Sequence, residues 1–134
     1  MYPTASSALV CKSKIRGCAL TLIKSGNAGE DRDHRQWLIG AFRREPGLYS
    51  EEVEVKWGSY KKGERRLGST PDKGYTLSIL VSGRFASIIA DDEGNELERL
   101  VFGKQGDYKL LGPGGMHTWE ALEDSIVLTV RWPE

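Results

Sequence analysis

The sequence predicts an all-β protein that folds as one jelly-roll barrel or sandwich, and three observations support this. No segment of the 134-residue chain carries a sustained helical stripe of apolar residues. Short segments of alternating apolar and polar residues recur from residue 53 onward, separated by turns rich in Gly and Asp. The length fits one domain, and a hydrophobic content of 39% is enough for one packed core. We therefore expect a single all-β domain.

The expected strands follow in order along the chain. Apolar runs at 19–23 and 36–42 predict two early strands, with a charged loop at 26–33 between them. From residue 53, apolar Val53, Val55 and Trp57 alternate with charged or small residues, which is typical of a half-buried strand. Further strands are expected at 75–81, 84–90, 97–102, 108–111 and 125–132. We divide the chain into an N-terminal strand and loop extension, residues 1–35, and a barrel, residues 36–134.

Composition argues against several classes of partner. Nineteen Lys and Arg balance nineteen Asp and Glu, so the formal net charge of zero gives no reason to expect nucleic acid or an anionic membrane. No run of about 18 apolar residues is present, and the residues before Cys11 lack the basic start and apolar length of a signal peptide. Cys11 and Cys18 match no zinc spacing and are expected to be reduced thiols. We therefore expect a cytoplasmic protein.

The stretch 106–120, Gly-Asp-Tyr-Lys-Leu-Leu-Gly-Pro-Gly-Gly-Met-His-Thr-Trp-Glu, resembles the second conserved motif of the cupin superfamily. That motif joins a Gly that starts a strand, a Pro/Gly turn and a His on the next strand, which is His117 here. The spacing between Pro113 and His117 is one residue shorter than in the commonest form. Gly83 fits the inter-strand glycine that ends the first motif. The resemblance implies an RmlC-like cupin barrel, a jelly roll also called a double-stranded β-helix, with an N-terminal strand extension.

The resemblance also implies where metal ligands would stand. Counting back from Gly83 places the usual ligand Glu at Thr76 and the two usual histidines near Thr70 and Asp72. Three of the four usual ligands are therefore absent, and only His117 remains. Because a firm metal site needs three or four ligands, we expect no metal and no cofactor, with a degenerate site that includes Asp72 left open.

More narrowly, the chain resembles a family of small single-domain bacterial cupins of largely unassigned function, over about residues 37–133. Its best markers are the segments 55–58, 62–64, 76–80 and 129–133. Relatives often have His where this chain has Tyr60, and some carry the label signal peptidase, which no Ser–Lys or Ser–His–Asp spacing here supports. The resemblance implies a homodimer in which the N-terminal extension packs on or across the partner, and the bulky run 36–42 could supply the interface.

Strand alternation selects the candidate site residues. Thr76 and Ser78 share one strand face, and Trp119 shares a face with His117. On the last strand the polar face is expected to line the pocket and the apolar face (Ile126, Leu128, Val130 and Trp132) to be core. The ligand-binding candidates are Thr76, Ser78, Trp119, Thr129, Arg131 and Trp57. Tyr60 is expected at the pocket mouth.

His117 and Arg131 carry the chemical argument. His117 is either a working imidazole, acting as acid, base, hydrogen-bond donor or lone ligand, or a relic histidine hydrogen-bonded in the barrel. Arg131 either holds a carboxylate or phosphate by two hydrogen bonds or forms a surface ion pair. The basic run 61–66 is expected to be a solvated hairpin, since no aromatic stacking platform accompanies it.

Three functions remain open at this point. The first is binding of a small polar organic molecule, such as a sugar or carboxylate, without metal. The second is a metal-independent isomerase, epimerase or cyclase that uses His117 as acid/base and Tyr60 as its partner, which leaves undecided whether the protein is an enzyme. The third is a metal-dependent cupin oxygenase, which the ligand count disfavours.

Overall fold

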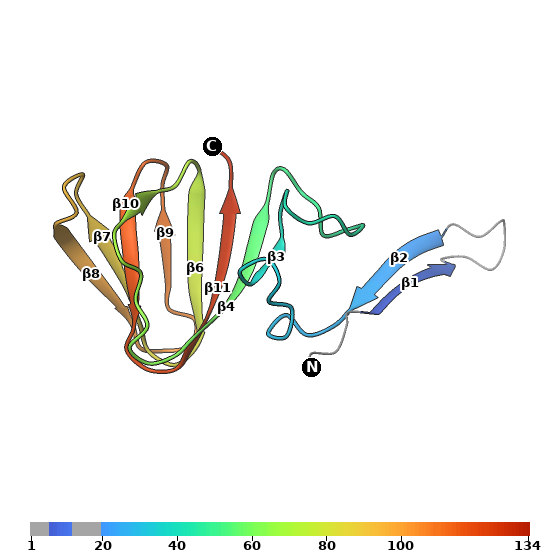
Figure 1. Ribbon diagram of the computed structural model, residues 1–134, viewed down its shortest axis with the longest axis horizontal. Coiled ribbons are helices and arrows are strands. Elements are labelled where there is room, and N and C mark those ends of the chain that lie inside the picture. Colours follow the sequence, from blue (N-terminus) through green and yellow to red (C-terminus); the bar gives the residue numbers. More distant parts are fainter. Residues whose placement is uncertain (1–5, 12–19) are drawn as a thin grey trace.

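The computed structural model describes residues 6–11 and 20–134, which form strands, turns and loops (Figure 1). The all-β prediction is confirmed: the described elements are strands in antiparallel sheets. None of the described residues belongs to a helix that could cross a membrane. The expected reduced thiols of Cys11 and Cys18 lie outside the side chains that the structure describes.

Two sheets face each other to make the barrel. The five-stranded sheet has the order β3 (Trp37–Ile39), β4 (Glu54–Tyr60), β11 (Ser125–Trp132), β6 (Tyr75–Ser82) and β9 (Tyr108–Leu111). The four-stranded sheet has the order β5 (Thr70–Pro71), β10 (Met116–Ala121), β7 (Phe85–Ala90) and β8 (Glu96–Phe102). Strands distant in sequence lie side by side, as β4 and β6 do on either side of β11, which is the arrangement of a jelly roll.

The N-terminal segment forms a separate antiparallel pair, β1 (Ser6–Cys11) and β2 (Leu20–Ser25), which Figure 1 shows beyond β3 and away from the barrel. The expected early strands at 19–23 and 36–42 correspond to β2 and β3, but β3 is shorter than expected. After Ile39 the chain turns: Arg43 N–H donates to the Gly40 carbonyl, and the buried Arg43 guanidinium pairs with Asp31 and Glu45. This buried charge fixes the loop and prevents an extended strand through residue 42.

The core fills one end of the space between the sheets. Tyr60 packs against Phe85 and Trp119, with ring centroids 5.3 and 4.5 Å apart. The buried members of this cluster are Tyr60, Leu80, Phe85, Phe102, Ala121 and Val127. Gly83 makes the tight turn between β6 and β7 with φ of +91°, and any Cβ there would overlap the Asp124 carbonyl and Ser125. The cluster closes this end of the barrel, so the open space lies at the other.

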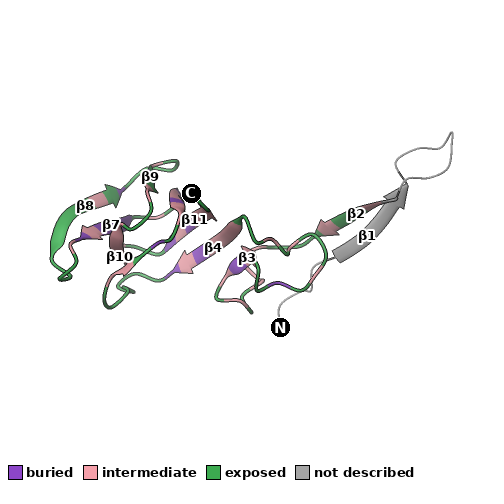
Figure 2. Cartoon of the chain, turned by 90° about the horizontal axis from the view of Figure 1, so that it is seen from above, coloured by how far each residue is buried: buried purple, intermediate pink, exposed green. Residues whose placement is uncertain are grey.

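The outer face of the five-stranded sheet differs from the prediction. We expected the apolar face of the last strand to be core, but Ile126, Leu128, Val130 and Trp132 are only half-buried, whereas Val127 is 2% exposed. Figure 2 shows half-buried residues next to buried ones along β4 and β11. The reason is that the inner face of this sheet surrounds a polar pocket over much of its length, so that the apolar residues point outward.

Candidate functional site

A cavity of about 460 Å³ occupies the barrel beyond the aromatic core. Cross-strand pairing places a polar row on its wall: Lys56 pairs with Thr129, Thr129 with Ser78, and Ser78 with Lys109. All four members of this row line the cavity. The next row inward consists of Gly58, Val127 and Leu80, which is small or apolar. The inner face therefore changes from core to pocket within one row of side chains.

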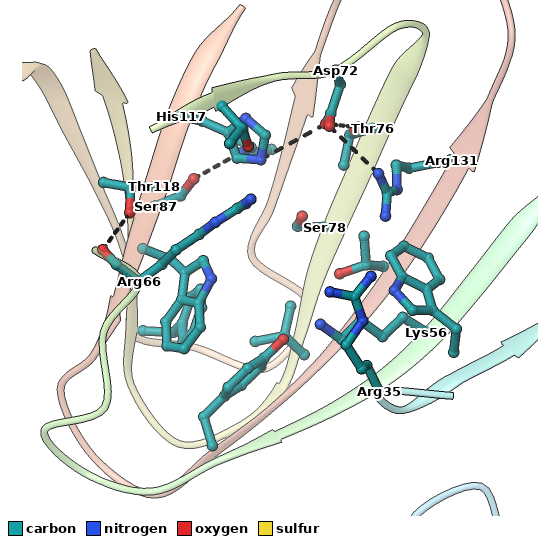
Figure 3. A pocket seen from close by; sticks show the side chains of 18 of the residues that line it. Arg35, Lys56, Arg66, Asp72, Thr76, Ser78, Ser87, His117, Thr118 and Arg131 are labelled. Carbon is teal, nitrogen blue, oxygen red and sulfur yellow. Dashed lines mark hydrogen bonds and ion pairs between the residues drawn. The ribbon is translucent and has the colours of Figure 1, made fainter. Parts of the chain in front are cut away.

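A cluster of four side chains lies toward the mouth, which we call the mouth cluster: Asp72, Thr76, His117 and Arg131 (Figure 3). The Thr76 hydroxyl donates to the Asp72 carboxylate. His117 Nε2 lies 3.7 Å from Asp72 Oδ2, and Arg131 Nη1 lies 3.5 Å from Asp72 Oδ1. The Gly114 amide donates to the Asp72 carbonyl at 2.8 Å, which ties this carboxylate to the Pro/Gly turn before His117. One buried carboxylate thus orients three neighbours.

Two nitrogens of the mouth cluster have unused hydrogen-bonding capacity. Among the described residues, buried His117 Nδ1 and Arg131 Nε have no hydrogen-bond partner. Arg131 Nε lies 3.3 Å from Glu54 Oε2, but the contact is an ion pair without hydrogen-bond geometry. Because buried polar atoms are nearly always satisfied in folded proteins, these two nitrogens indicate room for a polar ligand or ordered water.

Burial affects the titration of the groups in the pocket. Burial lowers the pKa of His117, while the nearby Asp72 carboxylate raises it and the Lys109 ammonium lowers it further. Lys109 is 7% exposed, and its ammonium donates to Ser87 Oγ at 2.7 Å. Burial also lowers the pKa of Lys109, against the opposing attraction of Asp72. The imidazole is therefore favoured in its neutral form at pH 7.

Lys56 lies against two aromatic rings. Its Nζ is 5.5 Å from the Trp37 ring centroid and 5.6 Å from that of Tyr60. Arg131 also covers Trp37, with its Cζ 4.1 Å from the ring centroid. Burial, followed by repulsion from Arg131, Arg66 and Arg35, lowers the pKa of Lys56 to about 8.

The pocket is strongly cationic although the whole chain is neutral. Two exposed arginines extend over the cavity, Arg66 from the loop after β4 and Arg35 from the loop before β3 (Figure 3). Arg35 has a φ of +52°, in the left-handed region that non-glycine residues seldom adopt. Five permanently or normally positive side chains line the cavity against one carboxylate, that of Asp72: Arg35, Lys56, Arg66, Lys109 and Arg131. A low-dielectric cavity of this kind attracts anions.

The structure brings together most of the residues selected from the sequence. The cavity is lined by His117 and Tyr60, and by the ligand-binding candidates Thr76, Ser78, Trp119, Thr129 and Arg131. Tyr60 lies within the buried aromatic core at the closed end of the barrel, not at the pocket mouth where we expected it. Trp57 is the exception, and its placement in the pocket was wrong. It stands between Lys56 and Gly58 on β4, so its indole points to the opposite face, where its Nε1 lies near Gly29. The roles of the lining residues remain predictions.

Sequence reasoning missed several lining residues, most notably Lys56 and Lys109. Both are charged residues between apolar neighbours on their strands, so alternation alone gave no reason to select them as pocket residues. Strand alternation could have found Lys56, because residues four apart on a strand share one face and the resemblance already placed Tyr60 at the pocket. Arg66 belongs to the basic run expected to be solvated, and it is exposed as expected, but it also reaches over the cavity.

The donor set does not fit a metal ion. The four positions of the usual cupin ligands do come together, since Thr70 pairs with His117 and both line the cavity with Asp72 and Thr76. Only His117 and Asp72 offer metal-binding atoms, and Asp72 is already engaged by Thr76 and Arg131. Across residues 21–134 no three His, Cys, Asp or Glu side chains are grouped as a metal site would require. The surrounding ammonium and guanidinium groups would oppose a further cation.

Comparison with known proteins supports the fold. No family model matches the chain, and no curated protein matches it. A cupin superfamily protein from Desulfitobacterium hafniense aligns with 15% identity and a TM-score of 0.54, covering 63% of this chain and 71% of that one. An RmlC-like cupin from Desulfovibrio desulfuricans aligns with 17% identity and a TM-score of 0.51, covering 63% and 74%.

A third similar structure is an oxalate decarboxylase from Bacillus subtilis, at 24% identity and a TM-score of 0.53. The aligned region covers 63% of this chain but only 22% of the decarboxylase, a protein with Mn(II) centres. Identities this low show a shared fold and nothing about activity. The two facing sheets, the Gly83 turn and these likenesses together confirm the fold prediction: this chain has the jelly-roll fold of the cupin superfamily.

Proposed function

We propose that this protein binds a small anionic organic molecule, such as a carboxylic acid or a phosphate ester, in the barrel cavity and without a metal ion. The observation that carries the proposal is the charge imbalance of the cavity, in which five cationic side chains face one carboxylate. Arg131 already contacts Asp72 and Glu54, but a neutral sugar would add no counter-charge for the other cations, whereas an anion would. The volume of about 460 Å³ suits a molecule of metabolite size.

The polar contacts available to such a ligand are specific. Arg131 offers a planar fork that matches a carboxylate or phosphate, and its buried Nε has no hydrogen-bond partner among the described residues. His117 Nδ1 likewise has no hydrogen bond of good geometry among the described residues, although the Gly115 backbone lies near the imidazole and raises its pKa. Thr129 and Ser78 supply hydroxyl groups on the wall between the two lysines. A ligand at the mouth cluster would therefore meet a guanidinium, an imidazole and hydroxyls.

Thermal-shift titration with a panel of compounds tests this proposal. The panel contains mono- and dicarboxylates, phosphate esters and neutral sugars, with EDTA present throughout. We expect anions to raise the melting temperature at millimolar concentrations, and the Arg131→Gln variant to weaken the response about tenfold, as loss of a charge-assisted contact of about 1.5 kcal/mol predicts. Lys62→Gln, which changes an exposed lysine outside the cavity, is the control. Stabilisation by neutral sugars alone, or an unchanged response in Arg131→Gln, would contradict the proposal.

A second candidate is a metal-independent isomerase or epimerase with His117 as acid/base. One observation favours it: Asp72 lies 3.7 Å from His117 and can orient the imidazole, a carboxylate that sequence alone could not place. Burial raises the pKa of Tyr60 to about 12, so this partner would act as a neutral hydroxyl. Incorporation of solvent deuterium into a bound acid, lost in His117→Asn, would support this candidate. Binding without any exchange would leave only the first.

A further inference from the structure

Lys56 differs from the other lysine of the cavity in its surroundings. Lys109 donates to Ser87 and is attracted by Asp72, so its proton is held by two partners. Lys56 points into the cavity from the middle of β4, and among the described residues no hydrogen bond or ion pair engages its Nζ. Its neighbours there are the faces of Trp37 and Tyr60. This amine is accessible to a ligand in the cavity.

The faces of Trp37 and Tyr60 favour the ammonium of Lys56, but burial and the nearby guanidinium groups disfavour it more strongly, so its pKa is lowered. On its own strand Tyr60 is a neutral phenol and Glu54 is engaged with Arg131. Arg131 comes from β11, Arg35 from the loop before β3, and Arg66 from the loop after β4, while Asp72 belongs to the mouth cluster. Lys109 stands on β9, three strands from Lys56 in the same polar row. Desolvation and three guanidiniums lower the pKa to about 8. Desolvated lysines next to another cation are the ones that proteins use as nucleophiles.

We propose that Lys56 Nζ forms an imine with a small carbonyl compound that carries a carboxylate, such as a 2-oxo acid, inside this cavity. The Nζ lone pair attacks the carbonyl carbon, and one proton moves from the nitrogen to the former carbonyl oxygen to give a neutral carbinolamine. The carbinolamine hydroxyl takes a second proton from solvent and leaves as water, so that one neutral amine, one carbonyl and one proton become one protonated imine and one water. Arg131 and Arg66 hold the carboxylate, and the reaction needs no oxidant or reductant.

The carboxylate requirement follows from the same cations. A guanidinium that repels the ammonium of Lys56 attracts the carboxylate of the ligand, so the two effects favour the neutral amine and the anionic carbonyl compound together. A neutral ketone would meet the neutral amine but would not be attracted by the guanidinium groups. This inference rests on the proposed anion binding and adds covalent chemistry at one atom.

Reductive trapping tests the inference with the full-length chain. The protein is incubated with pyruvate or glyoxylate and sodium cyanoborohydride, the intact mass is measured, and digestion locates the adduct. At pH 7 a lysine with a pKa near 8 holds on the order of a hundredfold more neutral amine than an ordinary lysine. We therefore expect one adduct, on Lys56, formed at least about tenfold faster than on any other lysine, with a rate that rises toward pH 8.

Variants separate the possible results. Lys56→Arg keeps the charge and removes the nucleophile, so the adduct should disappear while pyruvate still raises the melting temperature. Lys62→Arg, which changes an exposed lysine, should label like the original protein. Pyruvate that binds by thermal shift without trapping at Lys56 would overturn the imine and leave the proposed function intact. Neither binding nor trapping would overturn both, and equal labelling of many surface lysines would overturn the imine.

Discussion

Replacing Lys56 by Met should stabilise the ligand-free protein, since the folded state holds an ammonium in an unfavourable place. The pKa of Lys56 is about 8 in the folded chain, against its ordinary value of 10.5. Each pKa unit is about 1.4 kcal/mol, so the penalty at pH 7 is at most about 3 kcal/mol. Partial exposure and the lost contact with Trp37 reduce this to about 2 kcal/mol, or roughly 6–8 °C in melting temperature for a chain of this size.

The pH dependence gives this prediction its sign. The pKa of Lys56 is lower in the folded than in the unfolded chain, so the unfolded chain binds more protons between pH 8 and 10.5. The free energy of unfolding of the original protein therefore rises as the pH increases from 8 to 10.5. The penalty is therefore full below pH 8, and the advantage of Lys56→Met should shrink to less than about 1 kcal/mol by pH 10. Urea denaturation at pH 7 and pH 10 measures both values, with Lys62→Met as the exposed control. Equal stabilities at pH 7, or an advantage that does not shrink at pH 10, would refute the reasoning.

Three further predictions concern the core, the mouth cluster and the assembly. Gly58→Ala should destabilise the fold by about 1–3 kcal/mol in urea denaturation, because the new Cβ would lie 2.6 Å from the Tyr60 ring, which is held within the aromatic core. Gly103→Ala is the control and should be neutral in the same assay, since its Cβ would meet nothing closer than 3.5 Å. Asp72→Asn should lower the pKa of His117 further, because the carboxylate that favours the imidazolium is removed; an NMR titration of the two histidines measures this, and an unchanged value would show that the pair is not coupled. The protein should be a homodimer, with twice the mass of one chain in light scattering; a monomeric mass would contradict this.

The fold was predictable because its signals are local. Alternation and turn composition located most of the barrel strands, and the bounds of β9 and β11 match the expected ranges. The strand β10 was reached only through the resemblance of its Pro/Gly turn and His117 to a known motif, since its residues carry no clear apolar alternation. Buried Arg43, whose ion pairs shorten β3, was not predictable from its strand alone: Glu45 is two residues away, but Asp31 lies twelve residues before it and meets it only in the folded chain.

The candidate site was only half predictable, for a physical reason. The period of a strand tells which residues share a face, but not which face points into the barrel. In this barrel the interior is partly a polar cavity, so alternation gave no reason to select Lys56 and Lys109, and it selected Trp57, which faces away from the cavity. Arg35 and Arg66 reach the cavity from loops, where no periodic pattern exists.

The most direct test of the central claim is isothermal titration of the metal-free protein with a small dicarboxylate in EDTA-containing buffer. The cationic cavity predicts saturable binding at one site per chain, weakened by added salt and by Arg131→Gln. Binding that appears only when a divalent metal replaces the EDTA, or no anion binding at all, would contradict a metal-free anion site.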